Sequence, residues 1–242
     1  MVSRAVEDYL KTIYALQQDG SPATTNAIAG RLGLRAASVT AMLQQLSEQG
    51  LVEYKPYKGV HLTEAGLAAA LRVIRRHRLI ELYLNEELGV PWDRVHDEAE
   101  RLEHAISPYL EERIDAKLGH PVFDPHGAPI PTSTGHVPVR DLMPLSDLPL
   151  NTPSVVQHVP DDDPELLRRA ASLGLMPDAC VTVLDRDLAS GSISVTIGCD
   201  PETRQSAHSI NHDMAHSVFV SRPTPTSSSG PGPGTDADRQ TS

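Results

Sequence analysis

The residues best suited to chemistry are imidazoles and carboxylates that recur at helical spacing in the middle of the chain. On a helix, one arc of about 100° in the segment VHDEAERLEH would hold four of them: His96, Glu100, Glu103 and His104. An apolar stripe borders this arc, so the groups are expected beside buried surface. Slightly earlier, His77 and Glu81 are i,i+4 neighbours set among apolar residues. Burying such groups costs roughly several kcal/mol unless they are paired or bind a cation. The pattern therefore favours a divalent-metal site.

The coordination chemistry narrows the choice of metal. Imidazoles and carboxylates without a thiolate suit Mn²⁺ or Fe²⁺ better than Zn²⁺ or Cu⁺, although affinity alone would favour Cu²⁺ or Zn²⁺. The alternative is that these side chains are solvated charges with one Glu–His ion pair. Asp8 can likewise be interpreted in two ways, as a metal ligand or as a carboxylate near the start of a helix that interacts favourably with the helix dipole.

The elements that must position these groups follow from apolar periodicity. We predict helices over residues 4–18, 25–33 and 36–49, followed by two short β-runs around a Pro/Lys/Gly tip. This order indicates a winged helix-turn-helix. Two more helices are predicted, over 64–88 and 93–118. The second would bury a stripe made of Val95, Ala99, Leu102, Ile106, Leu110 and Ile114.

Charge is distributed unevenly in a way that points to DNA. The chain has a net charge of −11, yet residues 1–78 carry ten Lys/Arg against six Asp/Glu. Only this part suits phosphate contacts. The second helix of a helix-turn-helix enters the major groove, and small residues at its start allow close approach. The alternative is that these residues merely cap and fill a helical bundle. The candidate DNA-contacting residues are Arg4, Thr25, Arg35, Ala37, Ser38, Thr40, Gln44, Lys55, Tyr57 and Lys58.

The C-terminal half changes character. Residues 119–150 are rich in Pro and Gly and are expected to be loop and linker, with Asp124 and His126 shaping a turn. From 153 to 221, β-runs and one short helix suggest a small SH3-like β-barrel. Residues 222–242 lack core-forming side chains and are expected to be disordered. The fold class is thus mainly α with a small β domain. The expected division is 1–63 (DNA-binding), 64–141 (helical dimerisation and metal-binding), 142–152 (linker) and 153–221 (SH3-like).

Several features indicate a cytoplasmic protein with no membrane partner. No apolar run reaches the roughly 18 residues of a transmembrane helix, and the N-terminus does not resemble a signal peptide. Cys180 and Cys199 lie in no metal or redox motif, which favours a reducing compartment.

Taken together, these segments resemble the diphtheria toxin repressor family from about Val6 to Val220. The similarity includes EDYLKTIYAL, RRHRLIELYL, VPWDRVHDEAERLEH, DPHGAPIP and NHDMAHSVFV, in the same order and spacing. It implies a homodimer that binds a palindromic operator when divalent metal is present. The implied primary metal site is Asp8, Glu100, Glu103 and His104. The implied ancillary site is His77, Glu81 and His96, with further ligands from the SH3-like domain expected at Asp163 and Leu166 or their neighbours Asp162 and Glu165.

The resemblance also bears on the metal. Iron-responsive members carry Met and Cys where this chain has Asp8 and Glu100, and harder oxygen ligands match the harder Mn²⁺. Mn²⁺ is the expected cofactor, with Fe²⁺ as the alternative. The small manganese regulators use a Glu where this chain has Lys11, so a second ion in their arrangement is not expected. The predicted function is a metal-dependent repressor of metal-uptake genes. The alternatives are a metal-independent DNA-binding protein and a metallohydrolase. We do not expect the protein to be an enzyme, because the sequence has no HExxH or comparable hydrolase motif.

Overall fold

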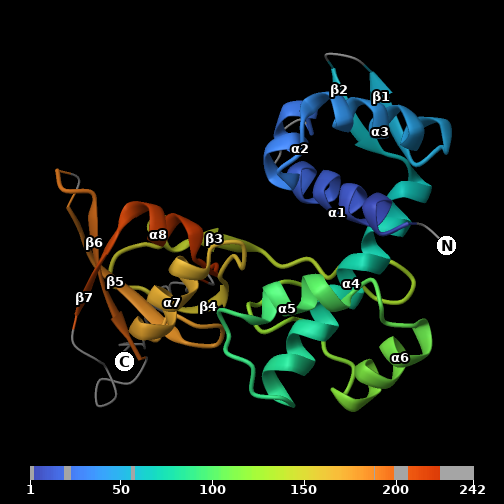
Figure 1. Cartoon of the computed structure of the whole chain (residues 1–242). Helices are drawn as coiled ribbons and strands as arrows, with labels where there is room; N and C mark the ends of the chain where they lie inside the picture. The colour runs from blue at the N-terminus through green and yellow to red at the C-terminus, as the bar shows by residue number, and fades with distance from the viewer. Residues whose placement is uncertain (1–2, 19–22, 56–57, 188, 199–206, 224–242) are drawn as a thin grey trace, which may run out of the picture.

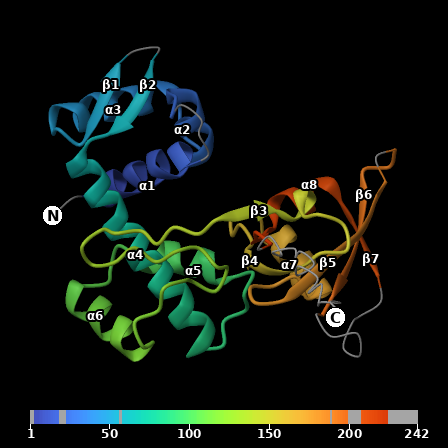
Figure 2. The same cartoon turned by 180° about the vertical axis from the view of Figure 1, so that it is seen from behind.

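The computed structural model describes residues 3–18, 23–55, 58–187, 189–198 and 207–223. Three units follow one another along the chain (Figures 1 and 2). Helices α1–α3 and a hairpin form the N-terminal unit, helices α4–α6 the central unit, and strands β3–β8 with two helices the C-terminal unit. Helix α4 runs from beside the N-terminal unit into the central unit and so joins the two (Figure 1). Among the described residues, no helix has the length and apolar content to cross a membrane.

The N-terminal unit is the expected winged helix-turn-helix. Its elements are α1 (Arg4–Gln18), α2 (Thr25–Leu32), α3 (Ala36–Glu48), β1 (Val52–Lys55) and β2 (Gly59–Leu62). Thr24 caps α2 by accepting a hydrogen bond from the amide of Ala27, and Gly33 ends it at φ 65°. Apolar faces of the three helices meet in one core that includes Leu10, Ile28 and Leu43, all fully buried. This core holds α3 with its N-terminal turn facing solvent.

The central unit contains α4 (Glu64–Glu86), α5 (Val95–Leu102) and α6 (Pro108–Lys117). The prediction of a single helix over 93–118 is wrong. Ser107 caps a new helix, and Pro108 occupies its first turn. The helix is interrupted here because proline has no backbone N–H to donate to the hydrogen-bond ladder of a continuous helix. The predicted buried stripe changes accordingly. Leu102 and Leu110 are exposed by 39% and 45%, whereas Val95, Ala99 and Ile114 are buried.

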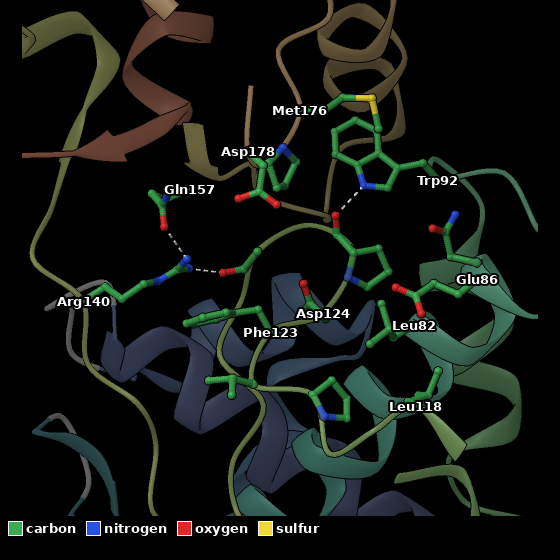
Figure 3. Close-up of a pocket in the computed structure, with 16 residues that line it drawn as sticks. Leu82, Glu86, Trp92, Leu118, Phe123, Asp124, Arg140, Gln157, Met176 and Asp178 are labelled. Carbon is green, nitrogen blue, oxygen red and sulfur yellow. Dashed lines mark hydrogen bonds between the residues drawn. The ribbon is translucent and has the colours of Figure 1, made fainter. Parts of the chain in front are cut away.

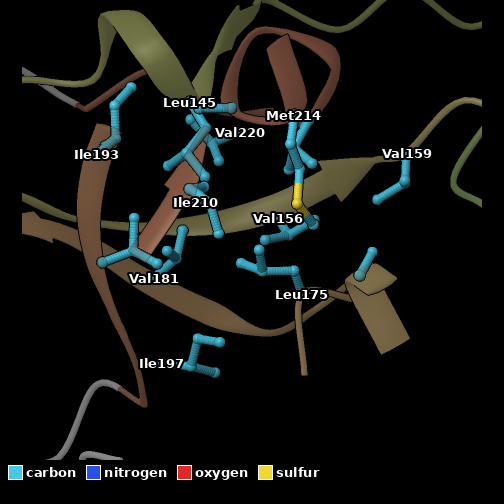
Figure 4. Packing of buried hydrophobic residues seen from close by; sticks show 14 of the residues in the cluster. Leu145, Val156, Val159, Leu175, Val181, Ile193, Ile197, Ile210, Met214 and Val220 are labelled. Atoms are coloured by element: carbon cyan, nitrogen blue, oxygen red, sulfur yellow. The ribbon is translucent and has the colours of Figure 1, made fainter. Parts of the chain in front are cut away.

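The C-terminal unit is an antiparallel sheet of six strands in the order β3-β8-β4-β5-β6-β7. Its strands are β3 (Leu142–Pro144), β4 (Pro153–His158), β5 (Cys180–Asp187), β6 (Ser192–Ile197), β7 (His208–Asn211) and β8 (Phe219–Ser221). Two helices, α7 (Pro164–Leu173) and α8 (His212–Ser217), and the 3₁₀ turn η1 (Leu145–Asp147) complete it. Figure 4 shows the apolar side chains, among them Val156, Leu175 and Val181, that fill its core.

Two details differ from expectation. The segment 142–152, expected as a linker, contributes β3 and η1, and β3 pairs with β8. Cys180 lies in a disulfide, whereas reduced thiols were expected. The tail residues 224–242, expected to be disordered, lie outside the described residues.

One side chain ties the central unit to the C-terminal one. Trp92, in the turn before α5, is only 8% exposed and belongs to the apolar core of the C-terminal unit. Its indole donates to the carbonyl of Pro125 at 2.9 Å, and its own carbonyl lies 2.9 Å from His126 Nε2. The position of the sheet relative to α5 is therefore fixed at this turn.

Candidate metal centre

The first candidate site lies where α1 meets the C-terminal end of α5. His104 Nε2 is 2.9 Å from Asp8 Oδ1 and 3.3 Å from Glu103 Oε1. The same Nε2 atom is buried and makes no hydrogen bond of acceptable geometry. On the other side of the ring, His104 Nδ1 lies 2.6 Å from Glu7 Oε2, which orients the imidazole with Nε2 toward the carboxylates. A buried ring nitrogen aimed at two carboxylates is the arrangement that a cation would complete.

Glu103 links this site to a second one. Its carboxylate is fully buried, and His77 Nδ1 lies 2.5 Å from Glu103 Oε2. His77 Nε2 in turn lies 3.0 Å from Glu81 Oε1. Because α4 supplies both His77 and Glu81, this helix contributes to one site directly and touches the other through Glu103.

The second candidate site joins the central and C-terminal units. Its ligand atoms come from His77, Glu81, His96 and Asp161, and all lie within 4.8 Å of one another. His96 Nδ1 is 3.1 Å from Asp161 Oδ2 and 3.3 Å from Glu81 Oε1. Asp161 lies in the loop between β4 and α7, so the sheet does contribute a carboxylate to this group.

That carboxylate is not one of those expected from sequence. Asp162 pairs with Arg31 at 3.4 Å, and Asp163 accepts hydrogen bonds from the first amides of α7. Glu165 is exposed in the first turn of that helix, and Leu166 packs partly against the sheet core. The structure thus brings Asp161, rather than Asp162, Asp163 or Glu165, beside His77, Glu81 and His96. The three aspartates are consecutive, and Asp163 is the N-cap residue of α7, so its carboxylate is already used by the helix.

A third group is entirely buried and consists of Glu81, Asp124 and His126. Asp124 Oδ1 accepts from the amides of His126 and Ala128, each at 2.9 Å, as expected for a turn-shaping residue. One atom of each group member nevertheless lacks a hydrogen-bond partner: Glu81 Oε2, Asp124 Oδ2 and His126 Nδ1. The turn-shaping role thus does not use the full bonding capacity of these side chains, a signal that sequence could not provide.

The electrostatics of these groups reflect charge pairing. Burial alone would lower the pKa of His77, but Glu81 and the hydrogen bond with Glu103 raise it to about 9. Burial is likewise outweighed at His96, where Asp161 and Glu81 raise the pKa to about 10. Glu103 shows the reverse: burial would raise its pKa, but His77 and Lys11 lower it. Without a metal ion, protonated imidazoles therefore neutralise the carboxylates.

Comparison with known proteins agrees with this geometry. The N-terminal DNA-binding domain of the iron dependent repressors matches residues 1–60, and their metal-binding and dimerisation domain matches residues 63–132. A FeoA domain matches residues 143–222. The iron-dependent repressor IdeR of Mycobacterium tuberculosis (strain ATCC 25618 / H37Rv) is 34% identical over 230 residues, covering 89% of this chain and 96% of the relative. The chain belongs to the iron-dependent repressor family.

Solved structures support the same placement. A manganese-dependent transcriptional repressor, in complex with manganese, has 40% sequence identity and a TM-score of 0.83, covering 90% of this chain and 100% of that one. The manganese regulator SloR has 29% identity and a TM-score of 0.70, covering 90% and 98%. The predicted resemblance and fold are thus confirmed, and the chain is a repressor-family, metal-dependent DNA-binding regulator.

Within this repressor-family chain, Glu100 stands slightly apart from the first site. Its carboxylate is grouped with the Glu103 carboxylate and the His77 imidazole rather than with Asp8 and His104. The ammonium of Lys11 lies between, at 2.6 Å from Glu100 Oε1 and 2.8 Å from Glu103 Oε1. Of the four expected primary ligands, the structure brings Asp8, Glu103 and His104 together directly, and Glu100 joins them through Lys11.

The DNA-binding unit presents most of the residues expected from sequence to solvent. Thr25 and Thr40 are half-buried, and the Thr40 hydroxyl donates to the carbonyl of Ala36 at 3.0 Å. That bond leaves Thr40 mainly its methyl group for contact with a base. Tyr57 lies outside the described residues. The exposed candidates are Arg4, Arg35, Ala37, Ser38, Gln44, Lys55 and Lys58.

A cavity lies beside the third candidate group, because Asp124 belongs to that group and also lines the cavity. It has a volume of about 510 Å³ and lies between α4, the loop 118–127 and the C-terminal unit (Figure 3). Arg140 stacks over the Phe123 ring at 3.9 Å and donates to Gln157, so its charge is already engaged. Asp124 reaches this cavity from the third group.

Proposed function

We propose that this chain is a manganese-responsive transcriptional repressor of metal-uptake genes, with Fe²⁺ as the alternative metal. It acts in the cytoplasm as a homodimer on a palindromic operator. The supporting observation is that imidazoles and carboxylates from all three units converge on two adjacent groups, which are linked by the contact between His77 Nδ1 and Glu103 Oε2.

The donor set supports a hard or borderline divalent ion. We assign the primary site to Asp8, Glu100, Glu103 and His104, in which the unpartnered Nε2 of His104 marks a ligand position. Three carboxylates and one imidazole, with no thiolate, fit Mn²⁺ or Fe²⁺. A bound divalent ion would supply the positive charge that draws these carboxylates together. The protein's part is to bring Asp8 on α1 to the end of α5 and to orient His104 through Glu7.

We assign the ancillary site to His77, Glu81, His96 and Asp161, because this group ties the sheet to the central helices. The buried group of Glu81, Asp124 and His126 is a second candidate position for an ion, favoured by three atoms that have no hydrogen-bond partner, although Asp124 Oδ2 also lies 3.5 Å from Arg78. A metal-soaked crystal measured at the manganese absorption edge distinguishes them. Density near Asp161 supports the first assignment, and density near Asp124 supports the second.

Functionally, we place the domain boundaries at 63 and 141, since α4 begins at Glu64 and β3 at Leu142. The exposed apolar side chains Leu102, Tyr109 and Leu110, at the α5–α6 turn, form the proposed dimer face. Pairing two central units there would fix the spacing of two α3 helices along DNA. The primary site connects α1 to α5, so it would also fix the orientation of the DNA-binding unit, and of its helix α3, relative to the central unit.

The test is operator binding by wild-type protein and the His104→Ala variant, with and without Mn²⁺. We expect wild type to bind only with metal and the variant to lose at least about 100-fold in metal-dependent affinity, because a ligand and its orienting contact disappear. Circular dichroism checks that the variant folds. Equal binding by metal-stripped and loaded wild type would instead select a metal-independent DNA-binding protein. Phosphoester turnover with added Mn²⁺ would select a metallohydrolase.

A further inference from the structure

The ammonium of Lys11 occupies the carboxylate cluster that the proposed primary site would use. It lies 2.6 Å from Glu100 Oε1, 2.8 Å from Glu103 Oε1 and 3.0 Å from Glu103 Oε2. Both oxygens of Glu103 are therefore engaged by one cation, and its carboxylate is fully buried. These distances are those of charge-assisted hydrogen bonds.

The position of Lys11 on α1 makes this contact part of the site. Lys11 follows Asp8 by three residues, so both side chains project from the same face of α1 toward α5. The oxygen that Lys11 holds most closely on Glu103, Oε1, also lies 3.3 Å from His104 Nε2. One oxygen thus serves both the ammonium and the ring nitrogen that is expected to ligate metal.

We propose that Lys11 is an internal counter-cation that assembles the metal-free site and that a divalent ion must displace. This inference rests on the proposed function. A divalent ion bound to Glu103 Oε1 would lie close to the ammonium, and two cations at such short range repel strongly. The Lys11 side chain is 19% exposed and has a flexible stem, so its head has a path to water.

Two consequences follow for the behaviour of the protein. Without metal, Glu100 and Glu103 do not simply repel one another, because Lys11 neutralises part of their charge. With metal, the contact to Lys11 must be given up, which weakens the apparent affinity. Lys11 would thereby set the metal concentration at which the repressor responds.

The experiment compares wild type with Lys11→Met, which keeps the length of the stem and removes the charge. We expect Mn²⁺ to bind at least about tenfold more tightly to Lys11→Met by isothermal titration calorimetry. We also expect the metal-free variant to melt several degrees lower than metal-free wild type. Lys11→Arg, which keeps the charge, should show neither change.

A matched control removes a lysine–carboxylate pair elsewhere. Lys117 on α6 lies 3.0 Å from Glu87, just beyond the end of α4, and Lys117→Met should leave Mn²⁺ affinity unchanged. Where Lys11→Met does not fold without metal, Lys11→Gln, with a neutral donor, replaces it in the titration. Folding of Lys11→Met that requires Mn²⁺ would also support the proposal.

Unchanged or weaker Mn²⁺ binding by a folded Lys11→Met or Lys11→Gln would overturn the proposal. The outcome is separable from the proposed function. If His104→Ala loses Mn²⁺ binding while Lys11→Met binds like wild type, only the role of Lys11 is wrong. If His104→Ala binds Mn²⁺ as tightly as wild type, the primary-site assignment itself fails.

Discussion

At the scale of single residues, the charge of His96 holds the metal-free ancillary site together. The pKa of His96 is raised to about 10, because hydrogen bonds and charge from Asp161 and Glu81 outweigh burial. Since this folded-state pKa lies above the unfolded value, the stabilisation is complete below about pH 6.5 and is lost as the pH rises toward 10.

We therefore predict that His96→Gln destabilises the metal-free protein most at low pH within this window. Relative to wild type, we expect a loss on the order of 1–3 kcal/mol near pH 6.5 that shrinks toward pH 10. Thermal melts in chelator across this range measure it. His136→Gln, at an exposed loop position, is the control and should follow wild type. A His96→Gln deficit that stays constant or grows with pH would contradict the charge-pairing argument.

Residue spacing predicted most of the candidate ligand side chains, but it did not predict all of their contacts. His77, Glu81 and His96 were predictable because helical geometry places them on facing surfaces. Asp161 was not, since three consecutive aspartates differ only in how the chain enters α7. Lys11 was noticed only through the resemblance. Its contact with Glu100 and Glu103 depends on the packing of α1 against the distant α5, which local pattern does not encode.

At the scale of elements, the break between α5 and α6 determines which surface remains open. The sequence pattern predicted one helix because the apolar stripe continues through Ile106 to Ile114. Ser107 and Pro108 carry a start signal that overrides that periodicity. Because the helix turns there, Leu102 and Leu110 leave the core and lie on the surface.

We predict that this surface is the dimer face, so Leu110→Glu should weaken dimerisation roughly 100-fold or more. Each subunit would lose the burial of one leucine, about 1.5 kcal/mol or more, and gain a repelling charge. Sedimentation velocity over a concentration series measures the change. Leu88→Glu is the control, since Leu88 is 61% exposed beyond the end of α4, and it should leave the dimer intact. A Leu110→Glu protein that sediments like wild type would place the dimer face elsewhere.

At the scale of the whole molecule, the C-terminal unit is attached to the central helices at few points. Trp92 inserts into the sheet core, Asp161 meets His96, and Arg168 lies 3.3 Å from Asp93 in an exposed pair. The last contact contributes little, because solvent screens it. The attachment to the helices therefore depends mainly on the tryptophan and on the half-buried pair of Asp161 and His96, beside loop contacts such as the hydrogen bond from the Val159 amide to the His126 carbonyl.

This arrangement predicts that Asp161→Asn loosens the C-terminal unit while primary metal binding persists. The variant removes the carboxylate from His96 but keeps the shape of the side chain, so the sheet core should stay folded. Limited proteolysis in the loop 132–141 should become severalfold faster, and the fluorescence of the single tryptophan should shift as Trp92 gains exposure. Glu165→Gln, on the same loop-helix junction but away from the site, should change neither signal. If Asp161→Asn is cleaved at the wild-type rate with unshifted fluorescence, the C-terminal unit is held by its other contacts, and Asp161 has no part in connecting it to the metal site.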